Sequence, residues 1–193
     1  MLQGIDVSRW QGVMDWTQAV KGGAQFAIVR AGSIDNYSGI AYADTQLFNN
    51  AGAAGLLPVS YYWFFRPNQP VERQAKYFVD LVLNIRRDFP VWCDIELAGN
   101  ASTVRKFCEL VRQVMPIGIY TNPNTVLYLL KGSKGWMADY PLWVADWTKP
   151  AWVPKPFKSW SVWQYSNLGN GRKYGAKSKT IDLNYGKEEF IEA

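Results

Sequence analysis

One stretch of the chain reads Phe89-Pro90-Val91-Trp92-Cys93-Asp94-Ile95-Glu96, an almost unbroken apolar run that ends in two carboxylates. Such a run is typical of a strand that is buried on both faces of a parallel sheet. Side chains two positions apart on a strand point to the same face, so Asp94 and Glu96 project into one space. Two like charges placed together raise the pKa of one carboxyl, which then stays protonated as a general acid beside an ionised partner. The stretch therefore predicts a buried strand that carries the chemistry of glycosidic bond cleavage.

Seven further apolar runs resemble this one and are expected to be strands. They are Gln3 to Ser8, Gln25 to Ala31, Leu57 to Phe64, Ile117 to Thr121, Leu142 to Asp146, Ser161 to Tyr165 and Thr180 to Asn184. Helical patterns occupy the first five gaps, at Trp16 to Lys21, Tyr42 to Ala54, Gln69 to Arg87, Thr103 to Val114 (capped by Ser102) and Pro123 to Leu130. Residues 147–160 contain three prolines and residues 166–179 are rich in Gly, Ser and Lys, so neither stretch is expected to be helical.

This order of elements predicts an α/β fold. Alternating strands and helices favour a right-handed parallel sheet, and eight strands can close it into a TIM-like barrel with about five helices, (β/α)5(β)3. An open doubly-wound sheet is the alternative. The sequence shows no internal repeat or linker, so residues 1–193 are expected to form a single domain.

A barrel of this kind places its site at the carboxyl ends of the strands. Asp6 ends the first strand, Asp94 and Glu96 end the fourth, and Asp182 lies in the eighth, which becomes a neighbour of the first on closure. Equivalent positions on other strands hold Arg30, Tyr62, Trp63, Tyr120, Asp146 and Gln164. A divalent metal site is the rival interpretation of clustered carboxylates. Because no phosphate-cradling glycine loop accompanies them, neither a metal nor another cofactor is expected.

Composition narrows the possible functions further. The chain has no histidine, which excludes Ser-His and Cys-His nucleophiles and removes the commonest zinc ligand. Its formal net charge of +5 suits an anionic target or serves solubility, and the cations are scattered except for a loose cluster from Arg172 to Lys179. A nucleic-acid partner is therefore not expected. Cys93 should face the helix that holds Cys108, where both are expected to be buried free thiols.

The ends of the chain and its apolar segments also carry expectations. The N-terminal residues run directly into a strand without a charged region, an apolar region or a cleavage site, so no signal peptide is expected. No apolar segment has the length of a membrane span, and no membrane insertion is expected.

The same residues resemble glycoside hydrolase family 25, the Chalaropsis-type lysozymes that include many phage endolysins. The likeness rests on several motifs in order along nearly the whole chain: Gly4 to Gly12 with Asp15-Trp16, Phe26 to Ala31, Tyr61-Tyr62-Trp63, Asp94-Ile95-Glu96, Gly118 to Asn122, Leu142 to Trp147, Trp163 to Ser166 and Ile181 to Asn184.

This resemblance implies an N-acetylmuramidase that hydrolyses the β-1,4 bond between N-acetylmuramic acid and N-acetylglucosamine in bacterial peptidoglycan. It implies that Glu96 is the general acid and that Asp94 orients the 2-acetamido group of the substrate, whose carbonyl oxygen attacks the anomeric carbon with retention. A direct nucleophilic role for an aspartate stays open. Asp6 and Asp182 would hold and tune this network. Candidates for the sugar-binding walls are Tyr62, Trp63, Tyr120, Trp147 and Gln164, with Arg30 also assigned to substrate binding.

Further expectations follow from the likeness. The chain is expected to be a monomeric, catalytic-only barrel without a separate wall-binding domain, which acts on the bacterial cell wall and reaches it by its basic surface. A phage endolysin held in the host cytoplasm until release and a mature secreted enzyme both agree with the missing leader. Two alternatives stay open: a catalytically silent barrel that binds peptidoglycan or chitin, and a chitinase-like glycosidase.

Overall fold

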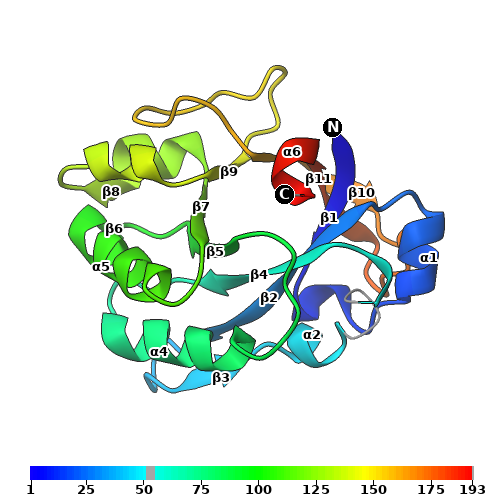
Figure 1. Ribbon diagram of the computed structural model, residues 1–193, viewed down its shortest axis with the longest axis horizontal. Coiled ribbons are helices and arrows are strands. Elements are labelled where there is room, and N and C mark those ends of the chain that lie inside the picture. The colour runs from blue at the N-terminus through cyan, green and yellow to red at the C-terminus, as the bar shows by residue number, and fades with distance from the viewer. Residues whose placement is uncertain (51–54, 193) are drawn as a thin grey trace.

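Eight strands form a closed barrel in the computed structural model, which describes residues 1–50 and 55–192 (Figure 1). The strands are β1 (Leu2–Val7), β2 (Phe26–Ile34), β4 (Val59–Phe64), β5 (Val91–Ile95), β7 (Ile117–Thr121), β9 (Leu142–Ala145), β10 (Val162–Asn170) and β11 (Thr180–Gly186). They pair in the order β1-β11-β10-β9-β7-β5-β4-β2, and pairing of β1 with β2 closes the ring. The predicted barrel and its eight strands are confirmed, and the open sheet is wrong.

The last strand departs from the predicted parallel sheet. β11 runs antiparallel to both of its neighbours, β10 and β1, whereas the other strands of the ring pair in parallel. A parallel neighbour needs a long crossover, usually a helix, but residues 171–179 return the chain directly as a hairpin. The two strands of this hairpin, β10 and β11, are long. They extend beyond the carboxyl-end rim of the barrel, the rim at which β1 and β2 also end.

Helices cover the outside of the barrel between its early strands. They are α1 (Trp16–Lys21), α2 (Thr45–Phe48), α4 (Val71–Val82) and α5 (Ala101–Arg112). The connections also hold short 3-10 turns, η1 (Arg9–Gln11) and η3 (Gly135–Asp139), and a π-helical turn, η2 (Thr125–Leu129). The C-terminal α6 (Glu188–Ile191) instead packs Phe190 and Ile191 against the aromatic side chains inside the barrel. The sequence did not predict η1, η3, α6 or the small strands β3 (Ala41–Ala43), β6 (Gly99–Asn100) and β8 (Leu130–Lys131). Within the described residues, no helix combines the length and the apolar character that membrane crossing requires.

Several predicted helix bounds need correction. The expected helix from Tyr42 to Ala54 begins as strand β3 and becomes helical only at Thr45, where Asp44 accepts a hydrogen bond from the Gln46 amide at 2.9 Å; its residues 51–54 lie outside the described residues. α4 is shorter than predicted at both ends. α5 begins at Ala101 because Asn100, not Ser102, caps it, accepting from the Ser102 amide at 3.0 Å. The stretch expected as the fifth helix is the π-helical turn η2.

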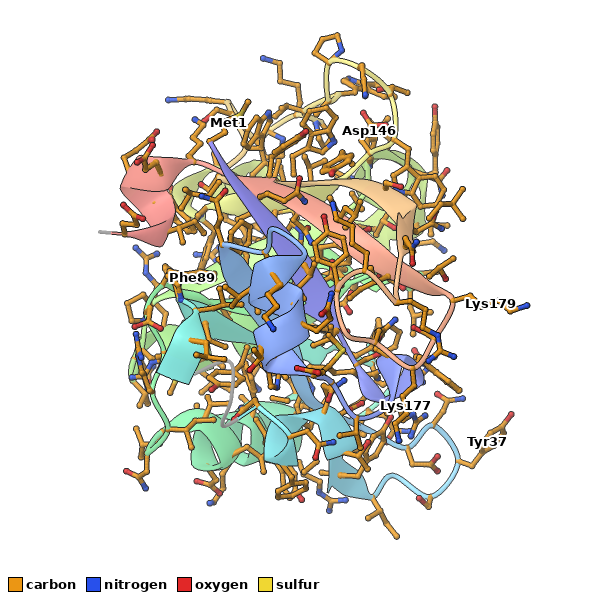
Figure 2. The ribbon with its side chains drawn as sticks, turned by 90° about the vertical axis from the view of Figure 1, so that its right-hand side faces the viewer. Met1, Tyr37, Phe89, Asp146, Lys177 and Lys179 are labelled. Atoms are coloured by element: carbon orange, nitrogen blue, oxygen red, sulfur yellow. The ribbon has the colours of Figure 1, made fainter. Side chains whose placement is uncertain are left out.

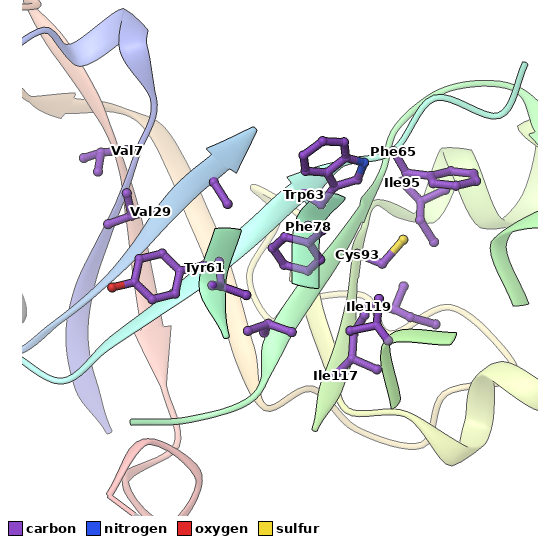
Figure 3. Close-up of a cluster of buried hydrophobic side chains, with 14 of the residues drawn as sticks. Val7, Val29, Tyr61, Trp63, Phe65, Phe78, Cys93, Ile95, Ile117 and Ile119 are labelled. Atoms are coloured by element: carbon purple, nitrogen blue, oxygen red, sulfur yellow. The ribbon is translucent and has the colours of Figure 1, made fainter. Parts of the chain in front are cut away.

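Two apolar layers hold the barrel together. The outer layer lies between strands and helices and includes Trp63, Phe78 and Cys93 (Figure 3). Cys93 and Cys108 are both buried free thiols in this layer, as predicted.

The inner layer fills the barrel with aromatic rings. Trp92 and Trp143 contact each other with centroids 5.7 Å apart inside the ring of strands. The rings fit because the facing residues are glycines: a Cβ on Gly118 would lie 2.4 Å from the Trp92 ring, and one on Gly4 would lie 2.2 Å from the Phe26 ring. This packed floor leaves only the carboxyl end of the barrel open to polar side chains.

Candidate active site

Asp6 and Asp182 meet at the seam where the barrel closes. They are register partners on the antiparallel strands β1 and β11, and their side chains hydrogen-bond to each other. Burial raises the pKa of Asp182 to about 8, helped by the charge of Asp6, and burial raises the pKa of Asp6 to about 6. The pair therefore holds one proton at neutral pH, with Asp182 as the donor and Asp6 as the anion.

Amide donors explain why Asp6 is the ionised member. Its Oδ2 accepts from Asn184 Nδ2 at 2.8 Å and from Gln164 Nε2 at 3.0 Å, and both contacts oppose the effect of burial on its pKa. Each amide is oriented from its other side: Trp143 Nε1 donates to Asn184 Oδ1 at 2.8 Å, and the Tyr120 hydroxyl donates to Gln164 Oε1 at 3.2 Å. The aromatic floor thus fixes the hydrogen-bond directions of the site above it.

Asp94 and Glu96 project from the end of β5 into the same space but differ in solvent access. Asp94 is buried, and its pKa is raised well above the usual range by burial and then by the charge of Glu96. Its Oδ1 has no hydrogen-bond partner among the described residues. The Glu96 side chain reaches the exposed mouth of the barrel. Partial loss of solvent around the carboxyl raises its pKa, while a hydrogen bond with Tyr120 and the charge of Arg30 oppose the rise.

Arg30 is the cation beneath the acidic cluster. Its guanidinium lies over the Phe64 ring, 4.9 Å from the centroid, and its Nε is 3.7 Å from Asp44 Oδ2. From this buried position its charge lowers the pKa of Asp94 and of Glu96. Arg30 therefore acts on the site through its field, and a contact with substrate stays a prediction.

An open groove of about 560 Å³ runs from Glu96 across the mouth of the barrel. Its lining includes Tyr120 and Gln164 from the predicted set, and the exposed ring of Trp147. It also includes residues that sequence reasoning did not assign to the site: Asn122, Pro123, Asn124, Ala145 and Trp152. Trp152 is 57% exposed. The signal that could have found it is the proline-rich segment directly after β9, because loops at the carboxyl ends of barrel strands build the site.

Asp146 holds this Trp-bearing loop. Its carboxylate accepts from the Thr148 amide at 3.2 Å, from the Thr148 hydroxyl at 2.7 Å and from the Trp152 amide at 2.5 Å. Its backbone oxygen accepts from Trp163 Nε1 at 2.5 Å. The carboxylate thereby joins the two ends of the segment that carries Trp147 and Trp152.

Tyr62 and Trp63 cannot share a face, and the structure separates them. Tyr62 points into the barrel, where its ring meets Trp143 at 5.9 Å. Trp63 points outward, is completely buried, and donates from Nε1 to Gln74 Oε1 of α4 at 3.1 Å (Figure 3). Its assignment to a sugar-binding wall is wrong, because neighbours on a strand alternate between faces and only the even-numbered residues of β4 face the site.

The cluster does not have the form of a metal centre. Within residues 1–50 and 55–192, no three acidic or cysteine side chains converge in a way that could hold one ion. A proton shared by Asp6 and Asp182, the amides of Asn184 and Gln164, and the positive charge of Arg30 offset the negative charge of the cluster instead. This arrangement suits proton transfer at a substrate that lies in the groove.

Comparisons with known proteins agree with this geometry. The sequence profile described as Glycosyl hydrolases family 25 matches residues 5–173. Lysozyme M1 of Streptomyces globisporus is 31% identical over 202 residues, which cover 95% of this chain and 67% of that protein. The autolytic lysozyme of Clostridium acetobutylicum is 26% identical over 88% of this chain, which spans only 52% of that relative.

Solved structures extend the likeness to three dimensions. The bacterial lysozyme from Streptomyces coelicolor superposes with a TM-score of 0.83 and 28% identity, over 100% of this chain and 95% of that one. The chain therefore belongs to family 25 of the glycosyl hydrolases and is a glycoside hydrolase of the lysozyme type.

Proposed function

We propose that the chain is an N-acetylmuramidase that hydrolyses the β-1,4 bond between N-acetylmuramic acid and N-acetylglucosamine in bacterial peptidoglycan. The observation that carries the proposal is Glu96, which lines an open groove with exposed tryptophans and is electrostatically coupled to the buried acids Asp6, Asp94 and Asp182 behind it. Flat apolar sugar faces stack on such rings. The family and its lysozyme relatives support peptidoglycan as the polymer.

Glu96 is the general acid in this proposal. It is the member of the cluster that lines the groove, and its raised pKa favours the protonated carboxyl that a general acid needs. A protonated carboxyl at this place can deliver its proton to the leaving glycosidic oxygen. Tyr120, whose hydroxyl lies beside both Glu96 and Gln164 Oε1, can then donate to the carboxylate that remains.

Asp94 recognises the 2-acetamido group of the substrate. Its unpartnered buried Oδ1 is an acceptor that an incoming amide N–H would satisfy. A hydrogen bond to the charged form lowers a carboxyl pKa, so an amide N–H at Oδ1 would favour the Asp94 carboxylate, with its proton released to solvent, and would place negative charge beside the developing oxazolinium cation. The acetamido oxygen attacks the anomeric carbon while the glycosidic bond breaks and Glu96 protonates the leaving oxygen. Water, which gives a proton back to the Glu96 carboxylate, then opens the oxazolinium ring, and the configuration is retained.

Asp6 and Asp182 complete the cluster as a proton-sharing pair. Together they carry one negative charge at neutral pH, held by Asn184 and Gln164. This limits the repulsion on Asp94 and leaves Asp182 as a donor to sugar or water. Direct attack by an aspartate is the competing mechanism.

The central test is mass spectrometry of fragments released from purified peptidoglycan by the wild type and by Glu96→Gln. The wild type should release new reducing-end muramic acid. The variant, which keeps the size of the side chain but has no acidic proton, should lose at least about a hundredfold in rate. A pull-down with intact sacculi controls for substrate binding by the variant.

Three outcomes separate the alternatives. Turnover of chitin but not of peptidoglycan would favour the chitinase-like enzyme, and binding of the wild type without any product would favour a silent barrel. A glycan whose muramic acid is de-N-acetylated should resist cleavage if the acetamido group is the nucleophile. Equal cleavage of that glycan would favour direct attack by an aspartate.

The wider biological setting is part of the same proposal. We expect residues 1–193 to act as one monomeric catalytic barrel on the cell wall, and size-exclusion chromatography with light scattering checks the monomer. A phage endolysin origin stays a prediction. It requires that the protein lyse host cells only when a membrane-permeabilising protein is co-expressed.

A further inference from the structure

A strip of exposed cations crosses one flank of the barrel, and the site described above does not use it. We call it the basic strip: Arg9, Lys21, Arg172, Lys173, Lys177 and Lys179. These residues come from η1, α1 and the hairpin between β10 and β11, which are far apart in the sequence. Figure 2 shows Lys177 and Lys179 on the same side of the molecule.

The cations of the basic strip have no carboxylate partner among the described residues. The ion pairs of the structure lie elsewhere: Arg30–Asp44, Lys76–Asp80, Arg86–Asp88, Arg105–Glu109 and Lys106–Glu72. Asp15 is the single acid within the segments 9–21 and 171–179, and it caps α1 by accepting from the Gln18 amide at 2.8 Å. The strip therefore has an uncompensated positive field.

Backbone contacts hold the strip in a fixed arrangement. The Lys177 amide donates to Gln11 O at 2.9 Å, and the Asp15 amide donates to Gly175 O at 2.9 Å. Gln18 Nε2 donates to Lys173 O at 3.0 Å. Charges that serve only solubility need no such fixed backbone, whereas a preorganised array loses less entropy when it binds a charged polymer.

The hairpin is also anchored from within. Tyr174 and Ala176 are buried in the outer apolar layer, so the tip between the cations is part of the core. Gly175 has a φ of +77°, and a Cβ there would lie 2.2 Å from Asp15 O. The glycine allows the hairpin to rest directly on the start of α1.

One end of the strip reaches the catalytic mouth. Arg9 follows the end of β1, which carries Asp6, and Lys179 precedes β11, which carries Asp182. At the other end of the strip, Lys21 is the last residue of α1. Near the mouth, the Arg9 guanidinium lies 5.1 Å from the centroid of Trp10, whose side chain is 71% exposed. Arg9 and Lys179 therefore lie at the end of the barrel that also carries Asp6 and Asp182.

We propose that the basic strip binds the linear polyol-phosphate polymers that are attached to peptidoglycan, and this inference rests on the proposed muramidase function. A polymer with a phosphodiester in every repeat matches an extended row of separate cations, because each repeat can meet one of them and release its counterions. The strip presents separate cations, whereas a site for a single small anion would need donors that converge on one point. Lysine ammonium groups also bind phosphate as point charges without demanding one geometry.

The test measures binding to sacculi before and after chemical removal of their polyol-phosphate polymers, at 50 mM and 200 mM salt. The strip variant carries Arg172→Ser, Lys173→Ser, Lys177→Ser and Lys179→Ser. The matched control removes the same number of cations that also have no carboxylate partner among the described residues, taken from α4, α5, β8 and the turn after β8, as Arg73→Ser, Arg112→Ser, Lys131→Ser and Lys134→Ser. Circular dichroism and thermal unfolding verify that both variants fold.

The proposal expects a specific pattern. The strip variant should bind untreated sacculi roughly tenfold more weakly than the wild type at 50 mM salt, and the control should bind like the wild type. The difference should shrink at 200 mM salt and vanish on stripped sacculi.

Other patterns would overturn it. Equal loss in the control would mean that only net charge matters, and equal loss on stripped sacculi would assign the strip to the carboxylates of the peptide stems. Tighter binding of a DNA duplex than of isolated polyglycerol phosphate would assign it to nucleic acid. Release of reducing ends from stripped sacculi by the wild type is measured in parallel, so failure of the muramidase proposal is seen separately from failure of the strip.

Discussion

Replacing Asp182 by asparagine should make the protein more stable at alkaline pH while it damages the site. The side chain lies at the barrel seam, hydrogen-bonded to Asp6, with a pKa of about 8 instead of the usual 3.8. The folded protein therefore keeps a proton on Asp182 that the unfolded chain releases. Asparagine has the same shape and is neutral at every pH, and its amide can still donate to Asp6.

The size of the effect follows from proton linkage. Between pH 3.8 and pH 8 the folded state binds one more proton at this residue than the unfolded state, so stability falls as pH rises, by about 1.4 kcal/mol per pH unit. From pH 5 to pH 8 the upper limit is about 4 kcal/mol. Asp182 is half-buried and shares its proton with Asp6, so we expect roughly 2 kcal/mol.

Urea unfolding at pH 5, 6, 7 and 8, followed by tryptophan fluorescence, measures this difference. The free energy of unfolding of the wild type should decline across the series more steeply than that of Asp182→Asn, and the variant should be the more stable protein at pH 8. The change Asp139→Asn on the exposed surface controls for the loss of one carboxylate. Parallel curves for the wild type and Asp182→Asn would refute the shared proton.

Three further predictions concern the groove and the barrel wall. In Tyr120→Phe the hydroxyl that lowers the Glu96 pKa is gone, so the alkaline limb of the pH-rate profile should move to higher pH. An unmoved limb would contradict Glu96 as the acid. In Asp146→Asn an amide NH2 must face donors that a carboxylate accepted, so the loop should loosen, with a roughly fivefold higher KM for peptidoglycan and little change in kcat; an equal fall in kcat would mean a direct catalytic role. Trp152→Ala should likewise raise KM but change the free energy of unfolding by no more than about 0.5 kcal/mol. Trp63→Ala should instead lower the free energy of unfolding in urea by about 3–5 kcal/mol. A stable Trp63→Ala variant with weakened substrate binding would mean that the Trp63 ring does line the groove.

The strands and most of the acidic cluster could be predicted from the chain alone. An apolar run such as Val91–Ile95 is typical of a buried parallel strand. In a barrel, the side chains that follow such a run lie at the rim formed by the carboxyl ends of the strands. Period-two alternation puts Asp94 and Glu96 on one face. The same rule would have separated Tyr62 from Trp63, since neighbours in a strand never share a face.

Helix bounds were less predictable because the caps compete locally. Asn100 and Ser102 can both begin α5, and the choice falls to the residue whose backbone is extended in the fold. The pattern of β11 itself does not set its direction, because such a strand can pair in parallel or antiparallel. The signal lay before it, in the non-helical stretch 166–179, which supplies no crossover helix.

The sequence by itself determined a barrel with two carboxylates at the end of its fourth strand, because burial and side-chain alternation are local properties of a strand. Only the tertiary structure decided that Asp6 and Asp182 share a proton, that Trp152 joins the groove, and that six distant cations form one strip. Each depends on closure of the ring or on the path of a loop. A pKa, a groove wall and a surface field are sums over neighbours in space, and the order of residues along the chain does not specify those neighbours until the chain has folded.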